Sequence, residues 1–256
     1  MLLAADIGNS NIVIGGISQG KTEFTARITT SKNMTDDMLA INLTNILSLY
    51  GFKKEQFSGA IISSVVPPVT RSMENAVKKA FGLNPIIVAP GIKTGLKIGI
   101  DNPAQMGSDM VADNVAAYNI YKKAVIVIDM GTATVISVTD KDGCFKGGVI
   151  YPGVTVSLNA LSQNAAQLPF IDIENPKKAV ETNSIECMRS GIVYGTASML
   201  DGMIERIKNE TGYDCVCVAT GGHARYIIPY CKEKIIYDEN LLLKGLDIIY
   251  NLNTRR

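Results

Sequence analysis

Apolar and polar residues alternate in short runs at the start of the chain, and this pattern predicts three consecutive strands. The runs within residues 2–30 are LLAADIGNS, NIVIGGISQGK and EFTARITT. The Gln19–Gly20 pair separates the second run from the third and predicts a hairpin turn. From residue 37 the spacing changes, because apolar side chains recur one helical turn apart. Residues 37–50 are therefore predicted to form a helix.

The rest of the first half alternates strands with helices. Its expected elements, in order, are the strand GAIISSVV, a helix over residues 69–81, the strand PIIVA and a helix over residues 109–122. The second half then repeats the opening pattern with the runs AVIVIDMG, TATVISVTDKDG and CFKGGVIYPG. After these strands we expect helices over residues 154–164 and 185–209, the strand CVCVAT, and a last helix over residues 241–252.

The two halves resemble each other in sequence as well as in element order. ADIGNSNIVIGGISQGK in the first half aligns without a gap on IDMGTATVISVTDKDGC in the second, and Asp142–Gly143 takes the place of the first hairpin turn. Such a match indicates an internal duplication. We expect an α/β fold of two duplicated lobes, residues 1–123 and 124–256, with a ligand cleft between them.

The composition narrows the classes of partner. The chain has 256 residues, of which 46% are hydrophobic and 19% charged, so it can bury a core. Its net charge of +1 provides no field for nucleic acid or anionic lipid. No run approaches the roughly 18 apolar residues of a membrane span, and the opening MLLAADIGN lacks the basic lead of a signal peptide. We expect a cytoplasmic protein without nucleic-acid or membrane partners.

The cysteines favour reduced thiols over disulfides or a metal site. Their number is five, which is odd, in a chain without a secretion signal. Cys215 and Cys217 would share one face of a strand, but no second Cys/His pair lies near them in the sequence to complete a tetrahedral zinc site. Buried, apolar cysteines are therefore the favoured interpretation.

Each half carries an Asp, a Gly and small polar residues directly after an apolar strand, as DIGNSN from Asp6 and as DMGTAT from Asp129. Glycine permits a tight turn whose N–H groups approach an anion, and short polar side chains donate to phosphate oxygens. The Asp suits a hydrated Mg²⁺ ion, because it would repel phosphate directly. A single copy would be explained by an Asp that caps a turn. Two matched copies favour two turns that bind the phosphates of a nucleotide from opposite sides.

A third feature lies near the end of the chain. The strand CVCVAT ends in Thr220, Gly221 and Gly222, where twin glycines would let a flat ligand such as adenine lie on the backbone. His223, the only histidine, follows directly. It has no nucleophile or metal ligand to pair with, so we expect no catalytic role for it.

These features together resemble the actin and sugar-kinase superfamily, which includes acetate kinases, sugar kinases and actin-like ATPases. The ordered motifs DIGNSN, SSVVPPVT, APGIKTGLKIG, DNPAQMGSD, DMGTAT, GGVIYPGV and MRSGIVYG resemble those of type III pantothenate kinases nearly from end to end. The resemblance implies a two-lobed fold with an ATP cleft. It also implies that ATP, with Mg²⁺, phosphorylates pantothenate to 4′-phosphopantothenate, the first step of coenzyme A biosynthesis.

The resemblance also implies roles for individual residues. It places the ATP-binding stretch on Asp6, Ile7, Gly8, Asn9, Ser10, Asn11, Ile12 and Val13, with Thr132 from the second turn. The family's substrate motif falls on Gly107, Ser108, Asp109 and Met110, with Asp109 as the catalytic base. Asp129, at the end of its strand beside the small polar Thr132 and Thr134, would bind a monovalent cation, potassium or ammonium. Ser184 aligns with a family threonine that reaches pantothenate across a homodimer interface.

The chain departs from the family pattern on the substrate side. Met110 stands where the family has an arginine for the pantothenate carboxylate, and Ile100 stands where it has a tyrosine. Another positive or N–H group would then have to bind that carboxylate. The candidates are Arg189, Lys97, Lys93 and the helix N–H groups near Gly107.

Two other functions remain open beside the kinase acting on pantothenate. The substitutions at Ile100 and Met110 would suit a kinase of the same fold with a different small acceptor. A non-catalytic regulatory relative is the other alternative. A protein without catalysis has no physical need for Asp6, Asp109 and Asp129 together, which favours an enzyme.

Asp109 can also be interpreted from its position alone. It lies at the start of a predicted helix, where the N-terminal dipole stabilises a carboxylate, so we expect a low pKa and a weak base. A weak base suffices, since phosphoryl transfer depends mainly on positioning. The alternative is an ordinary acidic residue of a first helical turn.

The predicted helix over 185–209 carries small and flexible residues near one face. They are Met188, Gly191, Gly195, Ser198 and Met199. This periodicity fits either a helix buried within one lobe or a helix that meets a second copy of the chain. The family resemblance favours the second arrangement, a two-fold homodimer.

Overall fold

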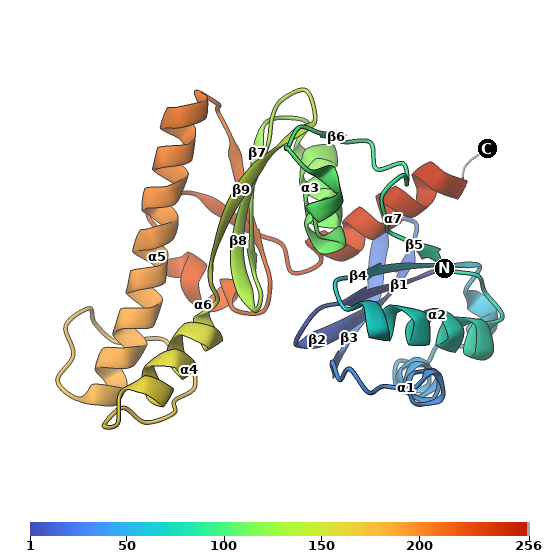
Figure 1. Ribbon diagram of the computed structural model, residues 1–256, viewed down its shortest axis with the longest axis horizontal. Coiled ribbons are helices and arrows are strands. Elements are labelled where there is room, and N and C mark those ends of the chain that lie inside the picture. The colour runs from blue at the N-terminus through green and yellow to red at the C-terminus, as the bar shows by residue number, and fades with distance from the viewer. Residues whose placement is uncertain (255–256) are drawn as a thin grey trace. The chain divides into compact units, whose positions relative to one another are not determined.

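The computed structural model describes residues 1–254 and divides the chain into two compact units (Figure 1). The first unit comprises Met1–Leu96, Ile100–Asn119 and the segment that begins at Asn240, and the second comprises Lys97–Gly99 and Ile120–Glu239. These units differ from the expected lobes, residues 1–123 and 124–256, chiefly because the C-terminal helix belongs to the first unit. Each unit is described by itself.

The first unit contains a five-stranded sheet of order β3-β2-β1-β4-β5. Its strands are β1 (Leu2–Ile7), β2 (Asn11–Ser18), β3 (Lys21–Thr29), β4 (Gly59–Ser64) and β5 (Ile86–Ile87). The first three strands are antiparallel neighbours, whereas β4 runs parallel to β1 and β5 parallel to β4. Gln19 and Gly20 have φ angles of 51° and 78°, as a two-residue hairpin turn requires, so the predicted turn is confirmed.

Helices cover both faces of this sheet, because successive strand residues point to opposite sides. Leu3 and Ala5 pack with α1 (Asp36–Leu49) and α2 (Pro67–Phe81), which lie together on one side of the unit (Figure 1). Leu2 and Ala4 pack with α3 (Ser108–Tyr121) and α7 (Leu241–Thr254). Helix α2 begins two residues earlier than predicted, since its two prolines fit a first helical turn. Two short 3₁₀ turns, Lys54–Gln56 and Pro103–Gln105, complete the unit.

Helices α3 and α7 approach each other closely at Gly245. A β-carbon added there would collide with the backbone oxygen of Ala112. Glycine at this position therefore lets α7 lie directly against α3, the helix that carries Asp109.

The second unit repeats the strand order of the first. Its sheet has the order β11-β10-β7-β8-β9-β6. Its strands are β6 (Lys97–Ile98), β7 (Val125–Met130), β8 (Ala133–Thr139), β9 (Cys144–Pro152), β10 (Val216–Thr220) and β11 (Ile235–Tyr237). Strands β7, β8 and β9 are antiparallel neighbours, and β10 runs parallel to β7, as β4 does to β1. Both second strands, β2 and β8, also shift register where they pair with the third.

The helices of the second unit are α4 (Val154–Asn164), α5 (Ser184–Thr211) and α6 (Ala224–Ile227), with a 3₁₀ turn at Ile228–Tyr230. Ile126 and Ile128 of β7 pack in one core with Leu200 of α5. The side chain of Asn183 accepts a hydrogen bond from the N–H of Glu186 and so caps the start of α5.

Two strands were not predicted. β6 and β11 have two and three residues, which is too short for a period-two pattern to be recognised. Among residues 1–254, no helix is both long enough and apolar enough to span a bilayer.

In the described part of the chain, no group of three His, Cys, Asp or Glu side chains could hold a metal ion, and this includes the cysteines. Cys217 is buried on β10, and burial raises the pKa of its thiol to about 11. The thiol therefore stays protonated near neutral pH, as expected for a buried, apolar cysteine.

Candidate functional site

The first hairpin places Asp6 at the end of β1, directly before a tight turn. The N–H of Gly8 donates to the carbonyl of Asn11 over 3.0 Å, which closes the turn. The Thr30 hydroxyl donates to the carbonyl of Gly8 over 2.7 Å and fixes the turn from β3. Asn9, Ser10 and Asn11 are exposed, so the polar tip can meet a ligand.

The hydrophobic members of the predicted ATP-binding stretch have another role. Ile7 and Ile12 are fully buried in the core beneath α1 and α2, and Val13 is half-buried. The side chains of the two isoleucines hold the turn in place, so only their backbone groups can contact a nucleotide.

Asp6 is linked by hydrogen bonds to the start of α3. The Ser63 hydroxyl, on β4 beside β1, donates to Oδ1 of Asp6 over 2.7 Å. The same Ser63 oxygen lies 2.9 Å from the hydroxyl oxygen of Ser108, the first residue of α3. Ser108 in turn accepts from the N–H of Ser64 over 2.8 Å. The first unit thus brings together Asp6, Ser108 and the adjoining Asp109.

Asp109 is half-buried at the first turn of α3, and its Oδ1 accepts a hydrogen bond from the N–H of Met110 over 2.7 Å. Burial raises the pKa of this carboxyl above 3.8, against the smaller opposite effect of backbone hydrogen bonds from Met110 and Asp109. The low pKa expected from the helix dipole is therefore wrong, because desolvation outweighs the helix start. A raised pKa makes Asp109 a stronger base than an exposed aspartate.

The two neighbours of Asp109 in the predicted substrate motif constrain it differently. A β-carbon at Gly107 would collide with Oδ1 of Asp109, so glycine leaves room for the carboxylate. Met110 is half-buried, and its carbonyl accepts a hydrogen bond from the Asn114 side chain over 2.9 Å. Its thioether offers packing but no charge.

The second hairpin forms a tight turn at Gly131–Thr132 after β7. The N–H of Gly131 donates to the carbonyl of Ala133 over 3.1 Å, and the N–H of Gly153 donates to the carbonyl of Thr132 over 3.2 Å. A β-carbon at Gly153 would lie 2.6 Å from the Gly131 oxygen and clash with Thr132. Thr132 is exposed at the tip of the turn, where a phosphate could reach it.

Asp129 is half-buried on β7, where it pairs with Val135 of β8 and with Thr220 of β10. The expected cation site grouped Asp129 with both Thr132 and Thr134. Thr134, however, pairs with Met130, and side chains of adjacent pairs point to opposite faces. Thr134 is therefore on the wrong face to join the Asp129 carboxylate.

The loop after β10 packs against the backbone of the second hairpin. Gly221 has a φ of 92°, and a β-carbon there would lie 2.6 Å from the Met130 carbonyl oxygen. Nε2 of His223 lies 3.0 Å from the hydroxyl of Thr155 on α4. Burial lowers the pKa of His223, so its ring is neutral near pH 7. No local pattern in the sequence indicates this pair, because Thr155 lies 68 residues from His223.

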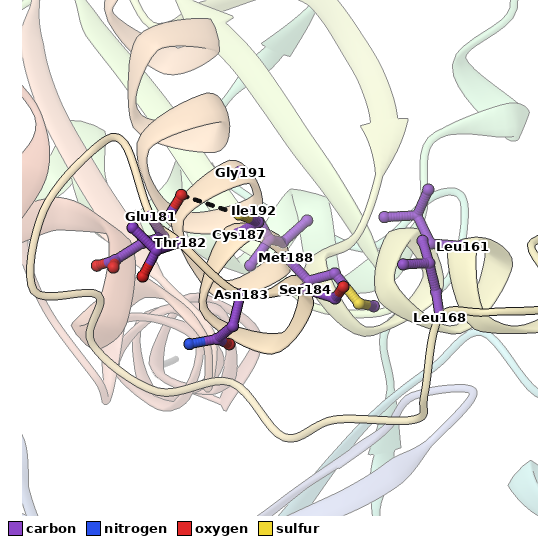
Figure 2. Close-up of a pocket in the computed structure, with 10 residues that line it drawn as sticks. All are labelled: Leu161, Leu168, Glu181, Thr182, Asn183, Ser184, Cys187, Met188, Gly191 and Ile192. Carbon is purple, nitrogen blue, oxygen red and sulfur yellow. Dashed lines mark hydrogen bonds between the residues drawn. The ribbon is translucent and has the colours of Figure 1, made fainter.

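Ser184 is exposed at the first residue of α5 and lines a pocket of about 630 Å³ in the second unit (Figure 2). Leu161 and Leu168 line one end of the pocket, and Glu181 lies toward the other. The Cys187 thiol, 3.4 Å from the Glu181 carbonyl, joins the start of α5 to the preceding loop. The remaining lining residues are Thr182, Asn183, Met188, Gly191 and Ile192.

The candidate replacements for the missing arginine differ in their surroundings. Arg189 forms ion pairs with Glu186 at 2.6 Å and with Glu174 at 3.0 Å, so two carboxylates already balance its charge. Lys93 and Lys97 are both exposed, in the first and the second unit respectively.

Comparison with known proteins identifies a family that covers most of the chain. A family model described as type III pantothenate kinase matches residues 2–206. A type III pantothenate kinase of Agathobacter rectalis is 39% identical over 100% of this chain and 99% of its own length. Relatives of the same name in Halalkalibacterium halodurans and Syntrophobacter fumaroxidans are 40% and 41% identical, over 99% and 100% of this chain and 100% and 99% of their own lengths.

Solved structures with low sequence identity share the fold. Component A of (R)-2-hydroxyglutaryl-CoA dehydratase from Acidaminococcus fermentans has a TM-score of 0.55 at 14% identity, over 98% of this chain and 96% of its own. A ROK hexokinase from Thermus thermophilus has a TM-score of 0.51 at 12% identity, over 97% of both chains. These likenesses confirm the predicted α/β fold of the actin and sugar-kinase type.

Proposed function

The chain belongs to the type III pantothenate kinase family, and from this premise we propose how its residues divide the work of transferring a phosphoryl group from ATP to pantothenate. The enzyme is a kinase, and its reaction is the first step of coenzyme A biosynthesis. The observation that carries the assignment of roles is the hydrogen-bonded link in the first unit, which joins Asp6 on β1 to Ser108 and thus to Asp109.

ATP has proposed ligands in each unit. In the first unit they are the polar turn residues Asn9, Ser10 and Asn11 and the N–H groups beside them, and in the second unit Thr132 at the tip of its turn. The Asp6 carboxylate beside the first turn fits the oxygen preference of Mg²⁺, which keeps most of its waters and takes one or two carboxylates. When bound, Mg²⁺ would neutralise charge on the phosphates.

Asp109 is the proposed base. Its carboxylate accepts a hydrogen bond from the primary hydroxyl of the acceptor and orients the oxygen toward the γ-phosphorus of ATP. It takes the proton as the new P–O bond forms and the bond from the γ-phosphorus to the bridging oxygen breaks, which releases ADP. The raised pKa serves this step, because a stronger base holds the proton better. Glycine at position 107 leaves the carboxylate its space.

The proposed monovalent cation, potassium or ammonium, is assigned to Asp129. The fit rests on one half-buried carboxylate at the end of β7, next to a turn whose carbonyls lie close together. Since Thr134 lies on the other face, the remaining oxygens would come from the backbone or from the phosphates. Potassium and ammonium are larger and more weakly hydrated than sodium, so such a site would discriminate among them.

A homodimer is proposed from α5 and its surroundings. Gly191, Gly195, Ser198 and Gly202 form a row along this helix, and a β-carbon at any of its three glycines would meet open space. Large apolar side chains around the start of α5 are exposed as well; they are Val156, Leu161, Phe170, Val180 and Ile185. A second copy that packs on this surface would cover both features and bring another chain to Ser184.

Replacing Gly195 with leucine tests the dimer without harming the helix, since leucine is the better helix former by roughly 0.8 kcal/mol. We expect Gly195→Leu to be a monomer by light scattering at micromolar concentration and to lose activity. Asn45→Leu, at an exposed position of α1, is the matched control and should stay dimeric. A wild-type enzyme that turns over as a monomer contradicts the proposal.

Phosphorylation of pantothenate by the purified enzyme tests the function as a whole. Product should form with ATP and potassium or ammonium, and Asp109→Asn should lower kcat by about 10²–10⁴-fold. Met110 supports a second candidate, a kinase for an acceptor without the carboxylate. If pantothenate at millimolar concentration gives no product while a neutral alcohol does, that candidate is correct. The expected cytoplasmic location stays a prediction.

A further inference from the structure

We propose that Ser63 and Ser108 are positioning residues for phosphoryl transfer, which hold the Asp6 carboxylate and the Asp109 helix start in a fixed relation through their hydroxyl groups. This inference rests on the proposed roles of Asp6 and Asp109. Neither hydroxyl needs to touch ATP or the acceptor, because each acts through a neighbouring carboxylate.

The arrangement of the two hydroxyls leaves little freedom. Ser63 is fully buried and Ser108 nearly so. Ser63 pairs with Asp6 across the parallel strands β4 and β1, and its oxygen lies 2.7 Å from the carboxylate. Ser108 is held at its other side by both backbone groups of Ser64, with 2.8 Å to the N–H and 3.0 Å to the carbonyl. A displacement of β1 would therefore be passed to the first turn of α3.

The number of hydrogens makes the link directional. Three contacts need a hydroxyl hydrogen, and they join Ser63 to Asp6, Ser63 to Ser108, and Ser108 to the Ser64 carbonyl. The two hydroxyl groups supply only two hydrogens for these three contacts. An ionised Asp6 can only accept, so Ser63 donates to it, and the Ser108 hydrogen is shared between Ser63 and the Ser64 carbonyl. The charge on Asp6 thus sets the orientation of both hydroxyls up to the residue before Asp109.

The adjacent hydroxyl of Ser64 shows what a purely local role looks like. Its oxygen lies 2.7 Å from the Thr70 hydroxyl and accepts from the N–H of Val66 over 3.1 Å, at the start of α2. It has no contact with Asp6. The side chains of Ser63 and Ser64 at the end of β4 therefore lie on opposite faces of the sheet, and only the Ser63 side chain reaches Asp6.

A double-mutant cycle on the full-length enzyme tests the link. Ser63→Ala and Ser108→Ala should each lower kcat about tenfold, because a shift of about 1 Å near the reacting groups can cost up to ~10²-fold. The KM values for ATP and pantothenate should change less than about twofold. Because both substitutions break one link, the double variant should be no slower than the slower single variant. Thr70→Val, which removes a hydroxyl on the α2 side, should keep kcat within about twofold.

The outcomes separate this inference from a structural role and from failure of the proposed function. Single variants with a lower unfolding temperature but an unchanged kcat would show that the hydroxyls only stabilise the fold. Losses of kcat that multiply in the double variant would show independent effects, and either result overturns the link. Asp109→Asn is measured alongside: if it retains its rate, the base assignment itself fails, whatever the cycle gives.

Discussion

The two hairpins share one strand order but are held in place by different means. In the first unit Asp6 lies opposite Ser63 of the adjacent parallel strand, and in the second Asp129 lies opposite Thr220. Beyond Ser63, side-chain hydroxyls connect the hairpin to α3. Beyond Thr220, the backbone of Gly221 presses directly against that of β7.

The different supports of the two hairpins suggest how two units with the same strand arrangement can serve separate tasks. Side-chain hydrogen bonds carry geometry from a strand to a helix, which suits the unit that holds the proposed base. A glycine contact leaves no side chain above the turn, which would suit the nucleotide proposed to bind there. The strand arrangement is the same in both units. We attribute their different proposed tasks to the residues at the ends of β4 and β10.

Substitution of Gly221 should have the largest effect on this comparison. Gly221→Ala places a methyl group at a φ of 92°, 2.6 Å from the Met130 oxygen, and should cost roughly 3 kcal/mol between strain and displacement of the strand. The unfolding midpoint in urea measures the loss. Gly82→Ala, at a φ of 70° with nothing within 4 Å of its β-carbon, should cost only the backbone strain, about 1–2 kcal/mol. Equal midpoints for the two variants would contradict backbone packing as the support of the second hairpin.

Exchange of the monovalent cation should distinguish the role of Asp129 from that of Asp6. We expect activity to fall about tenfold or more when sodium replaces potassium or ammonium. Asp129→Ala should lower both activity and ATP binding and should abolish the difference between the cations, because the ligand that distinguishes them is lost. Asp6→Ala should lower activity but keep that difference. Full activity in a sodium-only buffer would remove the proposed cation role.

Restoring the arginine tests the substrate side of the first unit. A carboxylate bound without a countercharge costs several kcal/mol in a closed pocket. Met110→Arg should therefore lower the apparent KM for pantothenate by up to tenfold, which corresponds to about 1.4 kcal/mol. The KM for ATP should hardly change, and Met110→Leu serves as the uncharged control. If Met110→Arg brings no gain and the wild type ignores millimolar pantothenate, the acceptor lacks that carboxylate.

The strand order and the helix positions could be predicted from the sequence because apolar periodicity and turn residues record them. Helix α4 begins and ends where predicted, and the Gln19–Gly20 turn forms as expected. The assignment of α7 to the first unit could not be predicted, since a chain that returns to an earlier sheet leaves no local signal.

The two turns of the candidate site could be predicted from the sequence, but the contacts that support them could not. The Asp6 and Asp129 turns stand out because their pattern occurs twice. Ser63 and Ser108 lie 45 residues apart, and only the fold brings their hydroxyls together. The pKa of Asp109 was predicted in the wrong direction, because helix position can be read from sequence and burial cannot.

The smallest expected effect concerns pH, and it compares the half-buried Asp109 of the first unit with the half-buried His223 of the second. Burial disfavours the charged form in both, so it raises the pKa of Asp109 and lowers that of His223. Asp109 must be ionised to accept a proton. Activity should thus be lost as the pH falls through the raised pKa of Asp109, and the acid limb of kcat/KM should lie above 3.8. His223→Gln should leave that limb in place, because His223 lies in the second unit and has no proposed part in the proton transfer.

The same shift has a consequence for stability with a definite sign. A carboxyl whose pKa is raised by folding destabilises the folded state as the pH rises above the pKa of the unfolded chain, and the loss is complete above the folded-state pKa, where the carboxyl is charged in both states. Asp109→Asn keeps the size of the side chain and removes the charge, so the inactive variant should unfold at a slightly higher temperature than the wild type at pH 7. The gain should vanish as the pH falls below 3.8, where the wild-type carboxyl is protonated in both the folded and the unfolded state. A variant that is inactive and also less stable at pH 7 would mean that the Asp109 carboxylate supports the fold, and the acid limb would then report unfolding instead of catalysis.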